Sequence, residues 1–168
     1  MRIIFLDFDG VLHPLGLQVE EHRTLNGKPV AKAIKVDFFC WLPLLLELVA
    51  EHGDVRFVAH TAWRESHDLA RLQGYFGEHR HLLVGATRAD LPKLESIQVW
   101  LEQNPQVAHW RILDDAVEEF VVVAGDADTQ EPAQYAPGLI ACDYRRGLQD
   151  LEVRRQLAHW LHLTRPQA

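Results

Sequence analysis

Apolar residues in this chain fall into short runs that alternate with longer stretches in which they recur at helical spacing. The short runs predict buried strands at about 2–7, 55–60, 110–113 and 139–142, a short strand or turn at 82–84, and a further strand at 120–124. The longer stretches predict helices at about 37–52, 65–76, 92–103 and 148–163. Strands that alternate with helices in this way indicate an α/β fold, with a doubly wound parallel sheet and helices on both of its faces.

The predicted helix at 37–52 has one irregular feature. Asp37 is suited to cap its N-terminus or to lie in its first turn, and Gly53 is suited to end it. Pro43 lies inside this run, where it would break a helix unless it occupied the first turn. In that case the helix would start nearer Trp41.

A polar segment at 13–35 separates the first strand from the first helix. It contains Asn26-Gly27, which is typical of a tight hairpin turn, and the breakers Pro14 and Pro29. About twenty residues are enough for a hairpin flap and too few for a large cap domain, so we expect an insertion of that kind.

Length and composition indicate one globular domain over residues 1–168. The net charge of −7 argues weakly against nonspecific binding to nucleic acid, although a local basic groove stays compatible with it. No apolar run approaches the ~20 residues that span a bilayer, and the first strand leaves no room for a cleaved signal peptide. Cys40 and Cys142 lie in apolar contexts and are expected to be buried thiols, which favours a cytoplasmic protein without membrane partners.

The first strand ends in the acidic motif Asp7-Phe8-Asp9-Gly10. Asp7 and Asp9 are two residues apart, so in an extended chain their side chains point the same way. Gly10 allows the backbone to turn tightly beyond them. Two neighbouring carboxylates repel each other, and a hard divalent cation such as Mg²⁺ relieves that repulsion. The motif therefore indicates a metal-assisted site at the end of the strand.

A hydrophobic strand followed by Asp-x-Asp-Gly-Val resembles the opening motif of the haloacid dehalogenase (HAD) superfamily of phosphohydrolases, and a Rossmann-like fold is implied. The resemblance implies that Asp7 is the nucleophile that forms an aspartyl-phosphate. Asp9 would be the general acid and then the base, and its backbone carbonyl would ligate the metal. Gly10 would belong to the phosphate-binding turn.

A second group follows the strand at 55–60. Thr61 is suited to donate to a phosphoryl oxygen, although a threonine there is also an ordinary helix cap. The sequence Thr61-Ala62-Trp63-Arg64 is similar to the Thr-Ser-Trp-Arg signature of small HAD domains in bacterial RNA-repair proteins. Ala62 departs from that signature and removes one phosphate donor. Arg64 would bind the phosphate or the substrate, or would be a surface charge.

The family also requires a cation near the start of the helix that precedes its last acidic strand. Lys93 occupies this position and is the only lysine between Lys35 and the C-terminus. Arg88 is the alternative.

Two pairs of acids compete for the last motif. Asp114 and Asp115 follow a hydrophobic strand, so Asp114 would ligate Mg²⁺ while Asp115 would ligate through water or hold Lys93. Asp126 and Asp128 also follow a hydrophobic run, but their spacing favours a turn.

Other features are less informative. The segment from Leu139 to Asp143 and the pair Gly147-Leu148 also resemble the RNA-repair branch. The histidines match no zinc-binding spacing, and His60, beside Thr61, is the one expected to line the pocket.

These features predict a Mg²⁺-dependent phosphomonoester hydrolase whose site opens at the carboxyl ends of the strands. Without a cap, the site could admit a nucleotide or a nucleic-acid end, or could close around a small phosphorylated molecule by forming a homo-oligomer. The alternative is a catalytically silent phosphate-binding or regulatory module on the same fold. Transfer to an acceptor other than water is a further alternative, although an acid at Asp9 favours phosphoryl transfer over dehalogenation.

Overall fold

Five parallel strands form the central sheet, in the order β5-β4-β1-β6-β9. A computed structural model of the chain describes residues 1–15, 18–23, 29–34, 37–124 and 132–166, with 18–23 and 29–34 described by their backbone alone. The strands of the sheet are β1 (Arg2–Leu6), β4 (Val55–Ala59), β5 (Leu83–Ala86), β6 (His109–Asp114) and β9 (Leu139–Ala141). β1 lies at the centre, where Leu6 is in register with Ala59 on one side and Leu113 on the other. The predicted α/β class and parallel sheet are confirmed.

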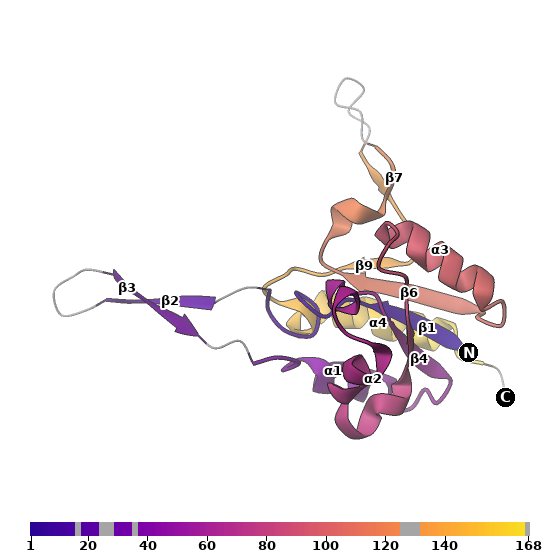
Figure 1. Cartoon of the computed structure of the whole chain (residues 1–168), viewed down its shortest axis with the longest axis horizontal. Helices are drawn as coiled ribbons and strands as arrows, with labels where there is room; N and C mark the ends of the chain where they lie inside the picture. Colours follow the sequence, from indigo (N-terminus) through magenta and orange to yellow (C-terminus); the bar gives the residue numbers. More distant parts are fainter. Residues whose placement is uncertain (16–17, 24–28, 35–36, 125–131, 167–168) are drawn as a thin grey trace.

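Helices cover both faces of the sheet (Figure 1). The helices are α1 (Leu42–Val49), α2 (Leu69–Gly74), α3 (Lys93–Gln103) and α4 (Leu151–Leu163). Side chains of β1 alternate between two hydrophobic clusters. Ile4 and Leu6 pack in the cluster that contains residues of α1, α2 and α4, whereas Ile3 and Phe5 pack in the cluster that contains α3. Every residue of β1 is buried, so the position of the residues that follow the strand is fixed by the core.

The first helix begins later than the strongest capping residue predicts. α1 has Trp41 at its N-cap and Pro43 in its first turn, so the interpretation that starts the helix near Trp41 is confirmed. Asp37 neither caps the helix nor lies in its first turn, and the helix ends at Val49, before Gly53. The cause is the proline, whose fixed backbone suits a first turn and no later position.

Residues just before α1 form turns instead of the predicted helix. Cys40 lies in this segment and is exposed, so the prediction of a buried thiol is wrong there, while Cys142 is buried as predicted. Phe39 is the one non-glycine residue with positive φ in the described ranges, at 62°. A bulky side chain in this left-handed conformation costs about 1–2 kcal/mol.

Shorter helical turns link the elements. The helix predicted at 65–76 is shorter in the structure, where α2 covers Leu69–Gly74, and a 3₁₀ helix, η1 (Ala62–Glu65), precedes it. Three other 3₁₀ helices lie at η2 (Gly77–Leu82), η3 (Val117–Phe120) and η4 (Gly147–Gln149).

Two strand pairs lie outside the main sheet. β7 (Val121–Val123) is a strand, as predicted, but it pairs with β8 (Gln134–Tyr135) in a separate antiparallel ribbon. β2 (Gln18–Arg23) and β3 (Pro29–Ile34) form an antiparallel pair within the range predicted as a flap, and this pair extends away from the sheet in Figure 1. The predicted turn at Asn26-Gly27 lies outside the described residues.

Within the insertion predicted at 13–35, the described segments 18–23 and 29–34 are strands and not parts of a helical cap domain. Among the described residues, no helix combines the length and the apolar character needed to cross a membrane.

Candidate functional site

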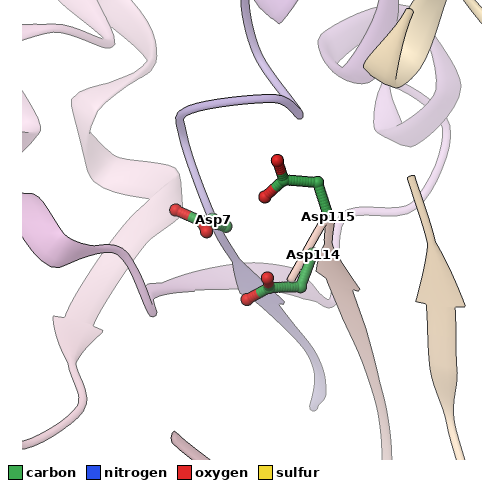
Figure 2. Close-up of side chains that lie close together, drawn as sticks. All are labelled: Asp7, Asp114 and Asp115. Carbon is green, nitrogen blue, oxygen red and sulfur yellow. The ribbon is translucent and has the colours of Figure 1, made fainter. Parts of the chain in front are cut away.

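Three carboxylates converge at the carboxyl end of the sheet. Asp7 follows β1, Asp114 is the last residue of β6 and Asp115 comes next (Figure 2). Each offers an oxygen, and these oxygens all lie within 4.8 Å of one another. The amide of Asp7 donates to the Leu113 carbonyl at 3.0 Å, which continues the pairing of β1 with β6 and holds the two strand ends together. The juxtaposition follows from the register of the two central strands.

Lys93, the first residue of α3, supplies the positive charge of the cluster. Its Nζ donates to Asp7 Oδ2 at 3.1 Å and to the two oxygens of Asp114 at 2.9 and 2.8 Å. It also lies 5.8 Å from the centre of the Phe120 ring, in a cation–π contact. The lysine thus contacts Asp7 and Asp114, and not Asp115, which the sequence had offered as one of its partners.

The cluster changes the proton affinity of its members. Burial, with the charge of Asp7 adding to it, raises the pKa of Asp114 to about 7. Burial also raises the pKa of Asp115 to about 6, and again the charge of Asp7 adds to it. For Lys93, burial is the largest single effect and favours a low pKa, but the charges of Asp7 and Asp114 together raise the pKa above its usual value. One lysine therefore does not balance the carboxylates that surround it.

The donor set fits a hard divalent cation. Carboxylate oxygens are the ligands that Mg²⁺ prefers, and Mg²⁺ commonly takes one or two carboxylates together with water and phosphate. The pKa values of Asp114 and Asp115 are raised first by burial and then by the charge of Asp7, and a divalent cation would offset both effects. The described residues could hold a metal at Asp7, Asp114 and Asp115.

Asp9 lies beside this cluster and both of its carboxylate oxygens are bonded to aromatic side chains. His13 Nε2 lies 3.0 Å from Oδ1, and Trp63 Nε1 donates to Oδ2 at 2.7 Å. The hydrogen bond with His13 is the main reason that the pKa of Asp9 lies below its usual value. Burial opposes this effect and the bond from Trp63 reinforces it. The side chain of Asp9 is thereby fixed, separately from the three carboxylates of the cluster.

Sequence reasoning missed both partners of Asp9. The sequence assigns no role to His13, which is fully buried and lies four residues after Asp9. Trp63 was noted only as part of a motif. The one available signal was its place in Thr61-Ala62-Trp63-Arg64, directly after a strand that neighbours β1.

The second predicted group also lies at this edge of the sheet, since β4 is adjacent to β1. Thr61 is buried, and its hydroxyl accepts a hydrogen bond from the Trp63 amide at 3.4 Å, so it caps η1. Arg64 Nη1 donates to the Thr61 carbonyl at 2.7 Å and its Nε donates to the Arg88 carbonyl at 3.3 Å. Ala62 is exposed. Burial lowers the pKa of Arg64, and the charge of Asp7 opposes that shift.

Gly10 closes the first motif with φ of +67°. A Cβ atom at this position would overlap the Asp115 carboxylate, with its Cγ only 2.5 Å away. The missing side chain therefore makes room for the Asp115 carboxylate, in addition to allowing the left-handed turn.

Some candidates do not join the site. Arg88 is exposed and pairs with Asp90, so it is not a substitute for Lys93. His60 is fully buried, lies 2.8 Å from the Thr87 hydroxyl and has its pKa lowered by burial to about 2. It is thus a neutral core residue and does not line a pocket as expected. Asp126 and Asp128, the alternative acids, lie outside the described residues.

Comparison with known proteins identifies one family. A family model described as "HAD domain in Swiss Army Knife RNA repair proteins" matches residues 3–153. No curated protein matches the chain. The matched range extends from β1 into α4 and includes every residue of the site described above.

Proposed function

The chain belongs to the family of HAD domains found in Swiss Army Knife RNA repair proteins, and on this premise we propose that it is a Mg²⁺-dependent phosphomonoesterase. The observation that supports this most directly is the contact of Lys93 with both Asp7 and Asp114, beside Asp115. A buried lysine between a nucleophile and a metal-binding carboxylate is arranged to offset the charge that a phosphoryl group brings.

In the proposed reaction Asp7 is the nucleophile. One oxygen of its carboxylate bonds to phosphorus while the bond from phosphorus to the ester oxygen breaks, which leaves an aspartyl-phosphate. Water then attacks phosphorus, and the acyl-phosphate bond breaks to regenerate Asp7 and release inorganic phosphate. Mg²⁺ bound by Asp7, Asp114 and Asp115 would stabilise the negative charge on the phosphoryl oxygens.

Asp9 is the proposed proton carrier. It gives a proton to the ester oxygen as that oxygen leaves, and it then accepts a proton from the attacking water. In the protein without substrate, the bonds from His13 and Trp63 hold the pKa of Asp9 low, which favours the ionised form. The negative charge of an arriving phosphoryl group acts in the opposite direction and would help Asp9 to take up its proton.

The other residues orient the substrate in this proposal. Lys93 neutralises charge on Asp7 and on the phosphoryl group, and Thr61 and Arg64 lie at the neighbouring strand end where a phosphoryl oxygen could be bound. Gly10 keeps the first turn close to Asp115. The substrate is proposed to be a nucleotide or a phosphorylated nucleic-acid end, which the description of the family supports.

The first test is hydrolysis of an aryl phosphate by the purified protein, with Mg²⁺ and with a chelator. We expect phosphate release that requires Mg²⁺ and that falls at least about 100-fold in Asp7→Asn, because the covalent step would be lost. Asp143→Asn is the matched control, since Asp143 is an exposed acid outside the cluster. Equal rates for Asp7→Asn and the parent protein would rule out Asp7 as the nucleophile. If no variant releases phosphate, binding of beryllofluoride to the parent protein would favour the silent phosphate-binding module.

A further inference from the structure

Phe38 is a large aromatic residue at the surface beside the proposed proton carrier. It retains 57% of its accessible surface. Its ring centre lies 5.1 Å from that of His13 and 5.6 Å from that of Trp63, and these are the two side chains that bind Asp9. The rings meet at 81° and 76°, so neither neighbour lies flat on Phe38. Phe38 therefore adjoins the part of the site that contains Asp9, with much of its ring available to a ligand.

The backbone keeps Phe38 at the surface at a cost in strain. Phe39 has a φ of 62°, which a bulky residue rarely adopts. In this conformation Phe39 packs inward, where it is 9% exposed and stacks on Tyr75 with ring centres 5.1 Å apart and an angle of 5°. The side chain of Phe38, by contrast, lies at the surface. Strain of this kind next to an exposed aromatic ring is a reason to look for a bound partner.

The position of Asp9 identifies the part of a substrate that would meet Phe38. Asp9 is proposed to protonate the ester oxygen, so the alcohol portion of the substrate must leave on this side. Phe38 contacts His13 and Trp63, and these two side chains in turn bind Asp9, so one side chain lies between Phe38 and the Asp9 carboxylate. A group that reached Phe38 would thus be separated from the ester oxygen by roughly one ring.

A nucleoside phosphate has this layout, because one sugar ring lies between its ester oxygen and its base. An aryl phosphate does not, since its ring is bonded directly to the ester oxygen and would lie at Asp9 itself. Planar bases stack on aromatic side chains whatever their sequence, which suits a single ring without hydrogen-bonding groups.

We propose that Phe38, supported by Trp63, is a stacking site for the base of a nucleoside phosphate whose phosphoryl group is bound at Asp7. This inference rests on the proposed phosphatase function and narrows its substrate to one with a base near the phosphate. The base could belong to a free nucleotide or to the terminal residue of an oligonucleotide, which present the same flat surface.

The test compares substrates that differ in the base. Rates would be measured for nucleoside 5′- and 3′-monophosphates, for a phosphorylated oligonucleotide and for ribose 5-phosphate, which lacks a base. For the parent protein we expect kcat/KM to be about tenfold or more higher with the better nucleotide than with ribose 5-phosphate, in line with the strength of base stacking. The relative rates of mononucleotide and oligonucleotide then distinguish the two sources of the base.

Variants assign the preference to the ring. Phe38→Ala and Phe38→Leu are expected to abolish most of the preference for nucleotides over ribose 5-phosphate, since leucine is apolar but has no flat surface. Phe38→Trp is expected to retain the preference. Tyr135→Ala is the matched control, since Tyr135 is an exposed aromatic residue on the β7–β8 ribbon, and it is expected to keep the full preference.

A preference that persists in Phe38→Ala, or an equal rate for all the esters in the parent protein, would overturn the stacking site and leave the phosphatase function intact. A binding measurement keeps the two proposals separate. The Asp7→Asn variant would be titrated with the same nucleotide and with ribose 5-phosphate in a calorimeter, and it is expected to bind the nucleotide more tightly than ribose 5-phosphate. The double variant, with Asp7→Asn and Phe38→Ala together, is expected to bind the two ligands equally. Equal affinities there would contradict the stacking site even if no variant turned over.

Discussion

At the scale of single residues, the carboxylates of the site are held in two different ways. Asp114 is buried and Asp115 is half-buried near Asp7, with one lysine among them, and their pKa values are raised to about 7 and about 6. Asp9 is bonded instead to two aromatic side chains, and its pKa is lowered. The first arrangement favours cation binding, and the second keeps one carboxylate ionised and oriented.

The raised pKa values predict how stability depends on pH and on Mg²⁺. For Asp114 and Asp115 the folded pKa lies above the unfolded value near 3.8, so their contribution to stability is present below about pH 4 and is lost as pH rises to about 7. Mg²⁺ should therefore raise the melting temperature most at pH 7–8 and little below about pH 5, where protons compete for the same oxygens. Thermal unfolding with Mg²⁺ and with chelator measures this. Asp115→Asn should reduce the Mg²⁺ effect, and Glu102→Gln, an exposed acid on α3, should not.

The two partners of Asp9 predict a dependence on the leaving group. Trp63→Phe keeps the ring and removes the N–H that binds Asp9, and His13→Leu removes the other bond. A proton carrier matters most for poor leaving groups, so we expect kcat for an alkyl phosphate to fall about 100-fold while kcat for an activated aryl phosphate changes less. Steady-state kinetics on the two esters check this. A uniform loss on both would indicate that the aromatic pair only supports the fold.

The sequence predicted the acids and the threonine because each follows a strand and parallel strands end at one edge, whereas Lys93 was predicted from the resemblance to the HAD family. It could not predict that Trp63 and His13 bind Asp9. Those contacts depend on how η1 and the turn after β1 are packed, and neither has a periodic signal.

At the scale of elements, the buried strands were predicted well and the turns between elements were not. Buried strands such as β1 and β4 carry a continuous apolar signal, whereas the start of α1 is decided by one proline that conflicts with an apparent cap at Asp37. β7 has the composition of a core strand, yet it is exposed in its ribbon, because composition does not specify the partner of a strand.

The turn after β1 supports a prediction at this scale. Gly10→Ala should cost about 1–2 kcal/mol from the left-handed backbone, and more because the new methyl group would overlap the Asp115 carboxylate. It should also weaken Mg²⁺ binding. Gly74→Ala is the control, since the end of α2 has open space there, and it should be neutral or slightly stabilising. Urea unfolding and Mg²⁺ titration would be measured for both. Unchanged Mg²⁺ affinity in Gly10→Ala would show that Asp115 can move without consequence.

At the scale of the whole molecule, the opposite end of the sheet carries an ion pair between the buried Arg2 and the half-buried Asp54, separate from the site. The guanidinium of Arg2 donates to both oxygens of Asp54 at 2.8 and 2.7 Å. It also donates to the Leu161 carbonyl at 2.6 Å and the Thr164 hydroxyl at 3.1 Å. One buried side chain thus ties the starts of β1 and β4 to the end of α4.

Loss of this contact should affect stability and leave the site unchanged. Arg2→Leu is expected to lower the free energy of unfolding by about 2 kcal/mol, because the half-buried Asp54 and the acceptors at the end of α4 lose their donor. The Mg²⁺ titration midpoint should stay as in the parent protein. Arg155→Leu, which removes an exposed ion pair on α4, should change the unfolding curve little. A shifted Mg²⁺ midpoint in Arg2→Leu would mean that the two ends of the sheet are coupled.

The central place of β1 has a consequence for how the protein folds. Asp7 meets Asp114 only after β6 has docked beside β1, and the chain between these two strands contains β4 and β5, which lie on the other side of β1. Pairing of segments so distant in sequence is slow, and the repulsion among the acids arises only when it is nearly complete. Mg²⁺ is therefore expected to slow unfolding more than it speeds folding, which stopped-flow measurements of both rates would reveal. The metal would thus stabilise the sheet after it has formed, and it would not take part in the folding nucleus.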